Sequence, residues 1–197
     1  MKRILLVDGE NFKGKIKAVF KEAGRERPVW NHYDFKSLFS KVLEGTPVSR
    51  SVFYFAKVKE HPESREKSKQ LIEEQRLLKT HLEKLGFEVI LSGRVRGLIE
   101  EDRKGKRNLV FREKGVDVKI AVDMVTLACD KVVEEIILAS SDSDLQPAIA
   151  EVRKRKIHCA YIGFEAQPNK GLSYTTNRTL LLRNAELIAA QLQPKLL

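Results

Sequence analysis

Short strand-like apolar runs alternate with amphipathic helical stretches along almost the whole chain, and this alternation restricts the fold more than any other feature. The strand-like runs are residues 3–8, 52–56, 87–91, 135–139, 157–162 and 179–182. Helical spacing of apolar residues marks 11–23, a segment after Asp34, 62–85, 116–129, 145–155 and 185–192. Parallel strands need crossover connections, which are usually helices. The sequence therefore predicts an α/β fold with three layers, in which helices flank a central, mainly parallel sheet.

The length of the chain fits one such unit. A chain of 197 residues can bury one substantial core but is short for two. We find no internal repeat, low-complexity tract or linker-like segment. A single domain over residues 1–197 is expected.

Acidic residues stand where the strands end. Asp8 closes the first strand, Asp142 and Asp144 follow the strand at 135–139, and Asp117 opens the helix at 116–129. The carboxyl ends of parallel strands share one edge of a sheet, where ligands bind. Carboxylates gathered there would repel one another unless a divalent cation or a proton neutralised them. The pattern predicts a metal-dependent catalyst that acts on phosphodiesters.

Helix capping is the competing interpretation of these acids. Asp8, Asn11 and Asp117 each stand near a helix start, where a side-chain oxygen can accept a backbone N–H. Asp142 is our preferred metal ligand beside Asp8 and Asp117, with Asp144 as an outer ligand or the ligand of a second metal. Mg²⁺ and Mn²⁺ take oxygen ligands of this kind. Asp123 lies about 120° round the helix from Asp117, on a stripe that looks solvent-facing.

The charge of the chain points to an anionic partner. Lys and Arg number 37 against 27 Asp and Glu, which gives a net charge of +10. Nucleic acid is the commonest partner of so basic a protein, although a merely solubilising surface is the alternative. A basic β-hairpin insertion at about 93–114 interrupts the strand–helix rhythm; it is equally consistent with a phosphate-binding flap and with a charged, protected sheet edge. The basic residues expected to bind nucleic acid are Lys13, Lys15, Arg94, Arg96, Lys104, Lys106, Arg107, Arg112 and Lys114.

Other features bound the setting of the protein. Cys129 and Cys159 lie in apolar runs and form no ligand cluster, so no disulfide framework is required. The sequence shows neither a signal peptide nor an apolar stretch of membrane-spanning length. A cytoplasmic protein without a membrane partner is expected, and its oligomeric state is left open, a homodimer included.

Three motifs together resemble the NYN domain family, in its LabA-like branch within the PIN-like nuclease superfamily. They are Val7-Asp8-Gly9-Glu10-Asn11, Lys114-Gly115-Val116-Asp117 continuing to Asp123-Met124, and Ser140-Ser141-Asp142-Ser143-Asp144-Leu145. The resemblance implies a PIN-like (Rossmannoid) fold, an acidic Mg²⁺ or Mn²⁺ site and RNA as substrate. It also assigns a secondary role to Asp123. Ser141 departs from the pattern, because relatives often have glycine there.

The function expected from the sequence is that of a metal-dependent ribonuclease, an endonuclease. The catalytic set is Asp8, Asn11, Asp117, Asp142 and Asp144, of which the four aspartates hold the metal; Asp123 and Ser141 are secondary. The alternative is a non-catalytic RNA-binding or regulatory module with a vestigial acidic pocket. A phosphatase of the haloacid-dehalogenase type has little support, because Glu10 occupies the second position after Asp8, where that family needs aspartate.

Overall fold

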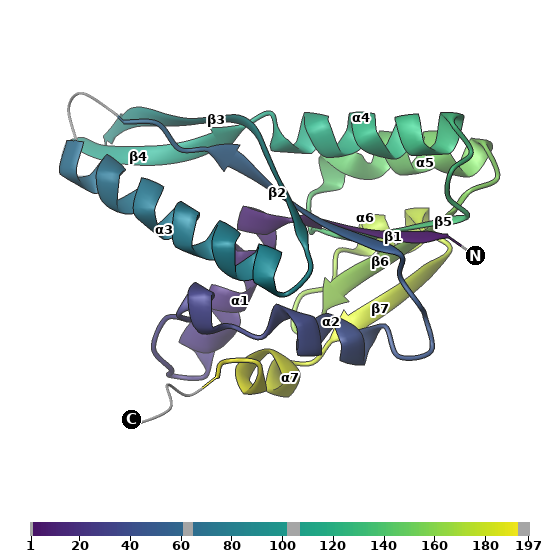
Figure 1. The fold of residues 1–197 in the computed structure, drawn as a ribbon, viewed down its shortest axis with the longest axis horizontal. Helices are drawn as coiled ribbons and strands as arrows, with labels where there is room; N and C mark the ends of the chain where they lie inside the picture. Colours follow the sequence, from purple (N-terminus) through teal and green to yellow (C-terminus); the bar gives the residue numbers. More distant parts are fainter. Residues whose placement is uncertain (1, 61–64, 102–106, 193–197) are drawn as a thin grey trace.

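The computed structural model describes residues 2–60, 65–101 and 107–192, and a seven-stranded sheet runs through its centre (Figure 1). The strands lie in the order β4-β3-β2-β1-β5-β6-β7. Their bounds are β1 (Arg3–Asp8), β2 (Arg50–Lys57), β3 (Glu88–Glu101), β4 (Arg107–Lys114), β5 (Glu135–Ala139), β6 (His158–Phe164) and β7 (Arg178–Leu182). All neighbouring strands are parallel except β3 and β4, which are antiparallel. The mainly parallel sheet predicted from the alternation is confirmed.

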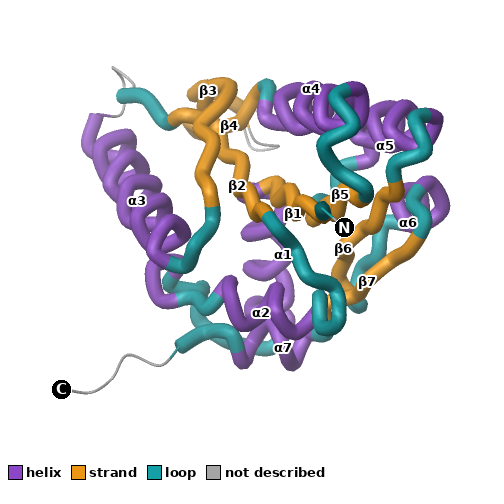
Figure 2. Tube along the Cα trace, turned by 45° about the vertical axis from the view of Figure 1, so that its right-hand side comes forward, coloured by secondary structure: helices purple, strands orange, loops and turns teal. Residues whose placement is uncertain are grey.

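Helices cover both faces of this sheet (Figures 1 and 2). They are α1 (Gly9–Glu22), α2 (Phe35–Val42), α3 (Arg65–Lys84), α4 (Val116–Cys129), α5 (Gln146–Lys154), α6 (Lys170–Thr175) and α7 (Asn184–Ala189), with the 3-10 turns η1 (Trp30–His32) and η3 (Ser143–Leu145). Buried residues of α1, α2, α3 and α7 share one core, and those of α4, α5 and α6 share the other. Among the described residues no helix is both long and apolar enough to cross a membrane.

Strand β1 lies in the middle of the sheet and is buried on both faces. Leu5 and Val7 pack in the core under α1 and α2, whereas Ile4 and Leu6 pack in the core under α4 and α5. Successive residues of a strand point to opposite faces, so four consecutive apolar residues are what a doubly covered strand requires. The position of β1 fixes where Asp8 leaves the sheet.

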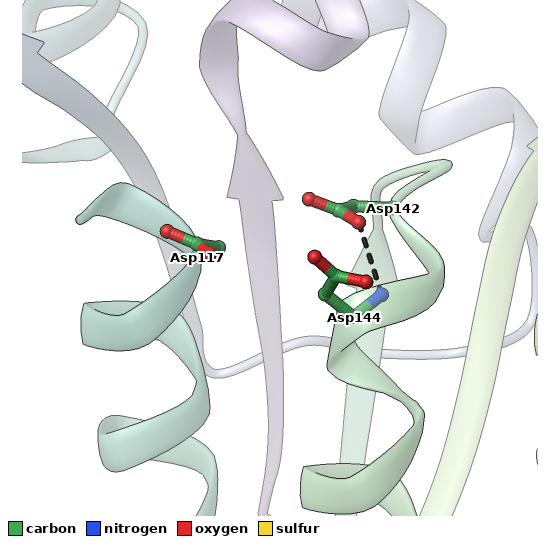
Figure 3. Close-up of side chains that lie close together, drawn as sticks. All are labelled: Asp117, Asp142 and Asp144. Carbon is green, nitrogen blue, oxygen red and sulfur yellow. Dashed lines mark hydrogen bonds between the residues drawn. The ribbon is translucent and has the colours of Figure 1, made fainter. Parts of the chain in front are cut away.

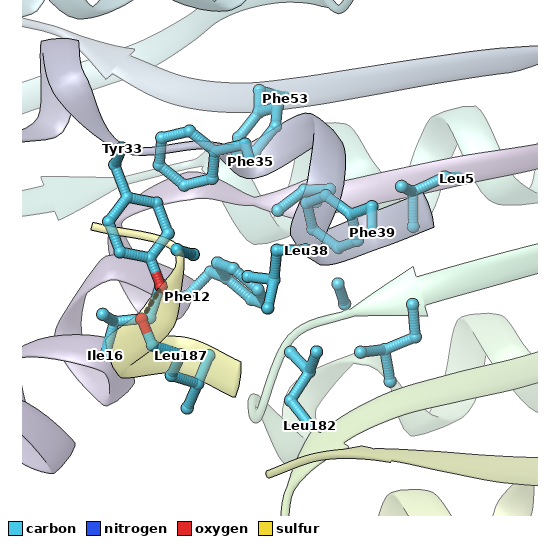
Figure 4. Packing of buried hydrophobic residues seen from close by; sticks show 14 of the residues in the cluster. Leu5, Phe12, Ile16, Tyr33, Phe35, Leu38, Phe39, Phe53, Leu182 and Leu187 are labelled. Atoms are coloured by element: carbon cyan, nitrogen blue, oxygen red, sulfur yellow. Dashed lines mark hydrogen bonds between the residues drawn. The ribbon is translucent and has the colours of Figure 1, made fainter. Parts of the chain in front are cut away.

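Aromatic rings fill the core between the sheet and α1, α2 and α7 (Figure 4). Phe53 of β2 packs edge-on against Phe35 and Phe87, with centroids 5.3 and 5.1 Å away. The hydroxyl of the fully buried Tyr33 donates a hydrogen bond of 2.7 Å to the carbonyl of Leu187. Such ring pairs contribute beyond the area they bury, and the pair of Phe35 with Phe53 holds α2 against β2.

The basic hairpin is part of the main sheet. Glu88 to Leu91 of β3 pair in parallel with β2, and the same strand then pairs antiparallel with β4 from Arg94 to Glu101. Gly93 stands between the two halves with φ +79°, and an ideal Cβ there would lie 2.2 Å from the Lys114 carbonyl oxygen. The predicted hairpin is confirmed for its two arms, and its predicted turn at 104–106 lies outside the described residues.

Helix α6 lies between β6 and β7, in a stretch to which the sequence analysis assigns neither a helix nor a strand. Asn169 caps this helix by accepting a hydrogen bond from the Leu172 N–H. The helix has six residues, and Gly171 lies within it. So short a segment has no apolar period to detect, because one residue, Leu172, is buried.

We expect Gly93→Ala to lower the free energy of unfolding by about 1–3 kcal/mol, because a positive φ strains any side chain and the carbonyl of Lys114 blocks this one. Urea denaturation measures the change. The matched control is Gly14→Ala in α1, where nothing lies within 4 Å of the added methyl group; it should stabilise the protein by about 0.5–1 kcal/mol. Equal effects of the two substitutions on the free energy of unfolding would contradict this account of Gly93.

Candidate metal centre

Three aspartates from separate segments meet at the carboxyl edge of the sheet. Asp142 and Asp144 follow β5, and Asp117 lies in the first turn of α4. Each offers a carboxylate oxygen within 4.8 Å of one from each of the others. Figure 3 shows Asp117 on one side of the end of β1 and the other two facing it from the opposite side. The convergence expected from the strand ends is present.

Asp8 lies at the same edge of the sheet and adds a fourth carboxylate to the acidic group. It pairs in register with Tyr54 at the end of β1 and is 6% exposed. A cavity of about 400 Å³ is lined by Asp8, Asp117 and Asp142, together with Asn11. We call this space the acidic cavity. Four of the five residues expected in the catalytic set line it. The fifth, Asp144, has a carboxylate oxygen within 4.8 Å of oxygens of Asp117 and Asp142.

Hydrogen bonds hold Asp8 and Asn11 in place. One carboxylate oxygen of Asp8 accepts the Asn11 N–H at 3.3 Å, and the other accepts the hydroxyl of buried Ser140 at 3.2 Å. The Asn11 side-chain oxygen accepts the N–H of Ser141 at 2.8 Å. The beginning of α1 is thereby tied to the loop after β5, so the acids of two strands keep a fixed relation.

The loop that carries Asp142 and Asp144 has its own supports. Asp142 accepts the Asp144 N–H at 3.0 Å and so caps η3, as Figure 3 shows. The amide group of Asn169 donates to the Ser141 carbonyl at 2.9 Å and to the Ser143 hydroxyl at 3.1 Å. Asn169 therefore buttresses this loop from the start of α6.

Among the described residues, no ion pair neutralises the negative charge of this group. Burial raises the pKa of Asp8 to about 6; the charges of Asp142 and Asp117 add to this, and the hydrogen bonds from Asn11 and Ser140 oppose it. Within the described ranges, none of the four aspartates forms an ion pair with a lysine or an arginine. Clustered oxygen donors without a cationic partner fit a hard divalent ion, so the donor set agrees with Mg²⁺ or Mn²⁺.

Comparison with known families decides the relationship of this chain. The NYN domain matches residues 2–182. The chain belongs to the NYN domain family. Its assignment to the LabA-like branch stays a prediction.

The chain also resembles solved structures. This NYN domain is similar to a protein of unknown function from Vibrio parahaemolyticus, with TM-score 0.57, 20% identity and 92% of each chain covered. It has a weaker similarity to a mutant of the T5 5′-exonuclease, with TM-score 0.42 and 15% identity over 82% of this chain and 50% of that one. No curated protein matches the chain. The Vibrio protein shares its fold.

The secondary candidates lie in different surroundings. Asp123 is farther along α4, where it accepts the Tyr54 hydroxyl at 2.9 Å and pairs with Lys119. It is not in the cluster of three aspartates. Ser141 is next to the acids, and its own hydroxyl is buried with no hydrogen-bond partner in the described structure. Of the two, Ser141 is the one that borders the acidic group.

The basic residues expected to bind nucleic acid are distributed unevenly. Lys114 is exposed and lines the acidic cavity, and Arg94 lies opposite it in the β3–β4 ladder. Lys13 is buried and paired with Glu10, and the ammonium group of Lys15 donates to Gln167 at 3.4 Å. Lys104 and Lys106 lie outside the described residues, as do the side chains of Arg96, Arg107 and Arg112.

Glu113 is a site residue that the sequence analysis missed. It lines the acidic cavity, and its carboxylate accepts the Ala56 N–H at 2.8 Å. Burial raises its pKa to about 7; the backbone hydrogen bond and Lys13 oppose this shift, whereas the charges of Glu10 and Asp8 add to it. The sequence shows only a glutamate inside a basic hairpin. Its role as a cavity residue depends on how the hairpin lies against the end of β2, which no local signal reveals.

The raised pKa of Glu113 predicts a pH-dependent stability in metal-free buffer. Between about pH 4.5 and 7 the unfolded chain releases this proton while the folded one retains it, so the free energy of unfolding falls as the pH rises. We expect Glu113→Gln to reduce that fall, by an amount on the order of 2 kcal/mol across the window. Urea denaturation at several pH values measures it. Exposed Glu22→Gln is the control, and an unchanged pH profile in Glu113→Gln would contradict the assignment.

Proposed function

We propose that this NYN domain is a divalent-metal-dependent ribonuclease, an endonuclease that hydrolyses RNA phosphodiester bonds. The observation that supports this most strongly is the gathering of Asp117, Asp142 and Asp144 within 4.8 Å, beside Asp8 and without a lysine or arginine partner in the described residues. RNA is the substrate that the family resemblance implies, and the net charge of +10 favours a polyanion.

Asp8, Asp117 and Asp142 would hold the ion, and Asp144 would support it or hold a second one. When bound, the ion supplies Lewis acidity toward the phosphodiester and the attacking water. The protein contributes positioning. Because Asn11 uses its side-chain oxygen for Ser141, its amide nitrogen remains to orient a water molecule or a phosphate oxygen. Hydrogen bonds to both oxygens of Asp8 keep that carboxylate fixed.

Glu113 and Lys114 lie side by side in sequence at the wall of the acidic cavity. A carboxyl group with a pKa near 7 is suited to accept a proton from water at neutral pH. The exposed ammonium group of Lys114 is suited to contact the RNA backbone. We assign Glu113 the role of proton acceptor and Lys114 that of a backbone contact.

A non-catalytic RNA-binding module is the second candidate. It is favoured by the capping roles of Asp8 and Asp142, which accept N–H groups at the starts of α1 and η3 and so have a structural use without any ion. This candidate predicts RNA binding that weakens with salt and no turnover with any divalent cation.

Cleavage of a labelled single-stranded RNA with Mn²⁺ separates the two candidates. We expect turnover by the wild type and a loss of at least about a hundredfold in Asp142→Asn, because removal of a ligand exceeds the 10–100-fold cost of removing its supporting partners. Exposed Asp130→Asn at the end of α4 is the matched control and should cleave normally. Undiminished cleavage by both Asp8→Asn and Asp142→Asn would refute the assigned site.

Thermal unfolding tests the ion itself, without any substrate. Mn²⁺ at a hundred times its Kd should raise the melting temperature by about 5–10 °C, because binding to the folded state alone stabilises it by about 2.7 kcal/mol. Asp117→Asn should lose this rise, and Asp130→Asn should keep it. A wild type whose melting temperature does not respond to Mn²⁺ or Mg²⁺ would favour the non-catalytic candidate.

A further inference from the structure

A second cavity adjoins the acidic one on the face of the sheet covered by α1 and α3. Its volume is about 550 Å³, and its walls come from α1, η1, β2, α3, β3 and β4. Pockets for small organic groups commonly measure about 300–1,000 Å³, so this one can take a flat ring system with its sugar. Nothing in the proposed chemistry of the aspartates accounts for it.

The two cavities share a wall. Glu113 lines both of them. Phe55 of the second cavity lies against Gly9, where an ideal Cβ would come 2.1 Å from the ring, so this aromatic wall begins directly after Asp8. Along α1, Asn11 bonds to Ser141 beside the acids, whereas Glu10 lines the second cavity. A chain of nucleotides placed over the acids would therefore lie beside Glu113, the residue that lines both cavities.

The charges of the second cavity are balanced by one another. The charged residues that line it are Lys13, Lys17, Arg27, Glu10, Glu74 and Glu113. Lys13 pairs with Glu10, and Arg27 with Glu74. The ammonium groups of Lys13 and Lys17 lie 5.4 and 5.8 Å from the centroid of the Trp30 ring. Such ion pairs give a phosphate no advantage here, because the carboxylates of Glu10 and Glu74 would repel it.

The remaining surface suits a neutral, flat heterocycle. Phe55, Phe111, Val95 and Leu71 supply apolar walls. A nucleobase has two flat π faces, which these apolar and aromatic walls can contact.

We propose that this second cavity is a base pocket, which takes one unpaired nucleobase of the RNA next to the scissile phosphate. The inference rests on the proposed ribonuclease function for its substrate, and it adds that the base beside the cut is recognised. It makes single-stranded RNA the substrate class, because a paired base cannot leave its stack without cost.

Abasic scanning of a short RNA tests the base pocket without catalysis. The protein is titrated into a labelled single-stranded hexanucleotide in EDTA, and binding is followed by fluorescence anisotropy. The titration is repeated with six versions of the RNA, each of which lacks the base at one position. We expect one position at which loss of the base weakens binding about tenfold, the usual contribution of a stacked base. Equal affinity for all the abasic versions, or no binding of the RNA at all, would overturn the proposal.

Two substitutions in α3 test whether the missing base is bound in the second cavity. Leu71→Trp fills the cavity and should remove the abasic penalty, which is the loss of affinity caused by the missing base. The complete and the abasic RNA should then bind this variant equally. Ile72→Trp is the matched control: Ile72 is 38% exposed on the same helix and does not line the cavity, so this variant should keep the penalty. A penalty that persists in Leu71→Trp would place the base elsewhere.

Trp30 gives an independent reading in the wild type, which does not depend on the folding of any variant. It is the single tryptophan of the chain and lines the second cavity. Its emission should change when the hexanucleotide binds and should not change with inorganic polyphosphate. The same response to both polyanions would contradict a base in the cavity.

The result also separates this inference from the nuclease proposal. An abasic penalty without cleavage under Mn²⁺ would keep the base pocket and reject the catalytic function. Cleavage without an abasic penalty would keep the catalytic function and reject the base pocket.

Discussion

Repulsion among carboxylates at one edge of a parallel sheet is the constraint on which the arrangement of this molecule depends. Asp8 lines the acidic cavity, where burial raises its pKa and the charges of Asp142 and Asp117 add to the shift. The fold opposes this repulsion by holding the carboxylates in fixed positions. Two doubly covered strands, β1 and β5, run side by side, and hydrogen bonds from Ser140 and Asn11 prevent the acids from moving apart.

The acidic group could be predicted because it needs only the direction of the strands. Asp8 and Asp142 follow apolar runs that read as buried strands, and parallel neighbours must bring such ends to one edge. Asp117 follows from its place at a helix start. Periodicity placed Asp123 on a solvent-facing stripe, and this was wrong: its side chain is half-buried, bonded to the hydroxyl of buried Tyr54 and paired with Lys119. These inferences use local pattern and one topological rule.

Residues whose position depends on long-range pairing could not be predicted. Glu113 becomes a cavity residue because β3 changes partner at Gly93 and brings β4 back beside the end of β2, as its bond to Ala56 shows. Asn169 supports the acidic loop from a helix too short to leave a periodic signal. Lys13 looks like a surface lysine from sequence, yet the arrangement of α1, η1 and β2 buries it against Trp30 and Phe55. Tertiary context, which no window of sequence contains, decides all three.

The central place of β1 also has a consequence for how the protein forms. Its residues 3–7 pair with residues 135–139, so one side of this strand finds its partner only across more than half of the given chain. Contacts between such distant segments slow folding, because a long loop must close before they stabilise anything. Asp142 comes directly after β5. The segments that carry Asp8 and Asp142 therefore come together only when β1 pairs with β5.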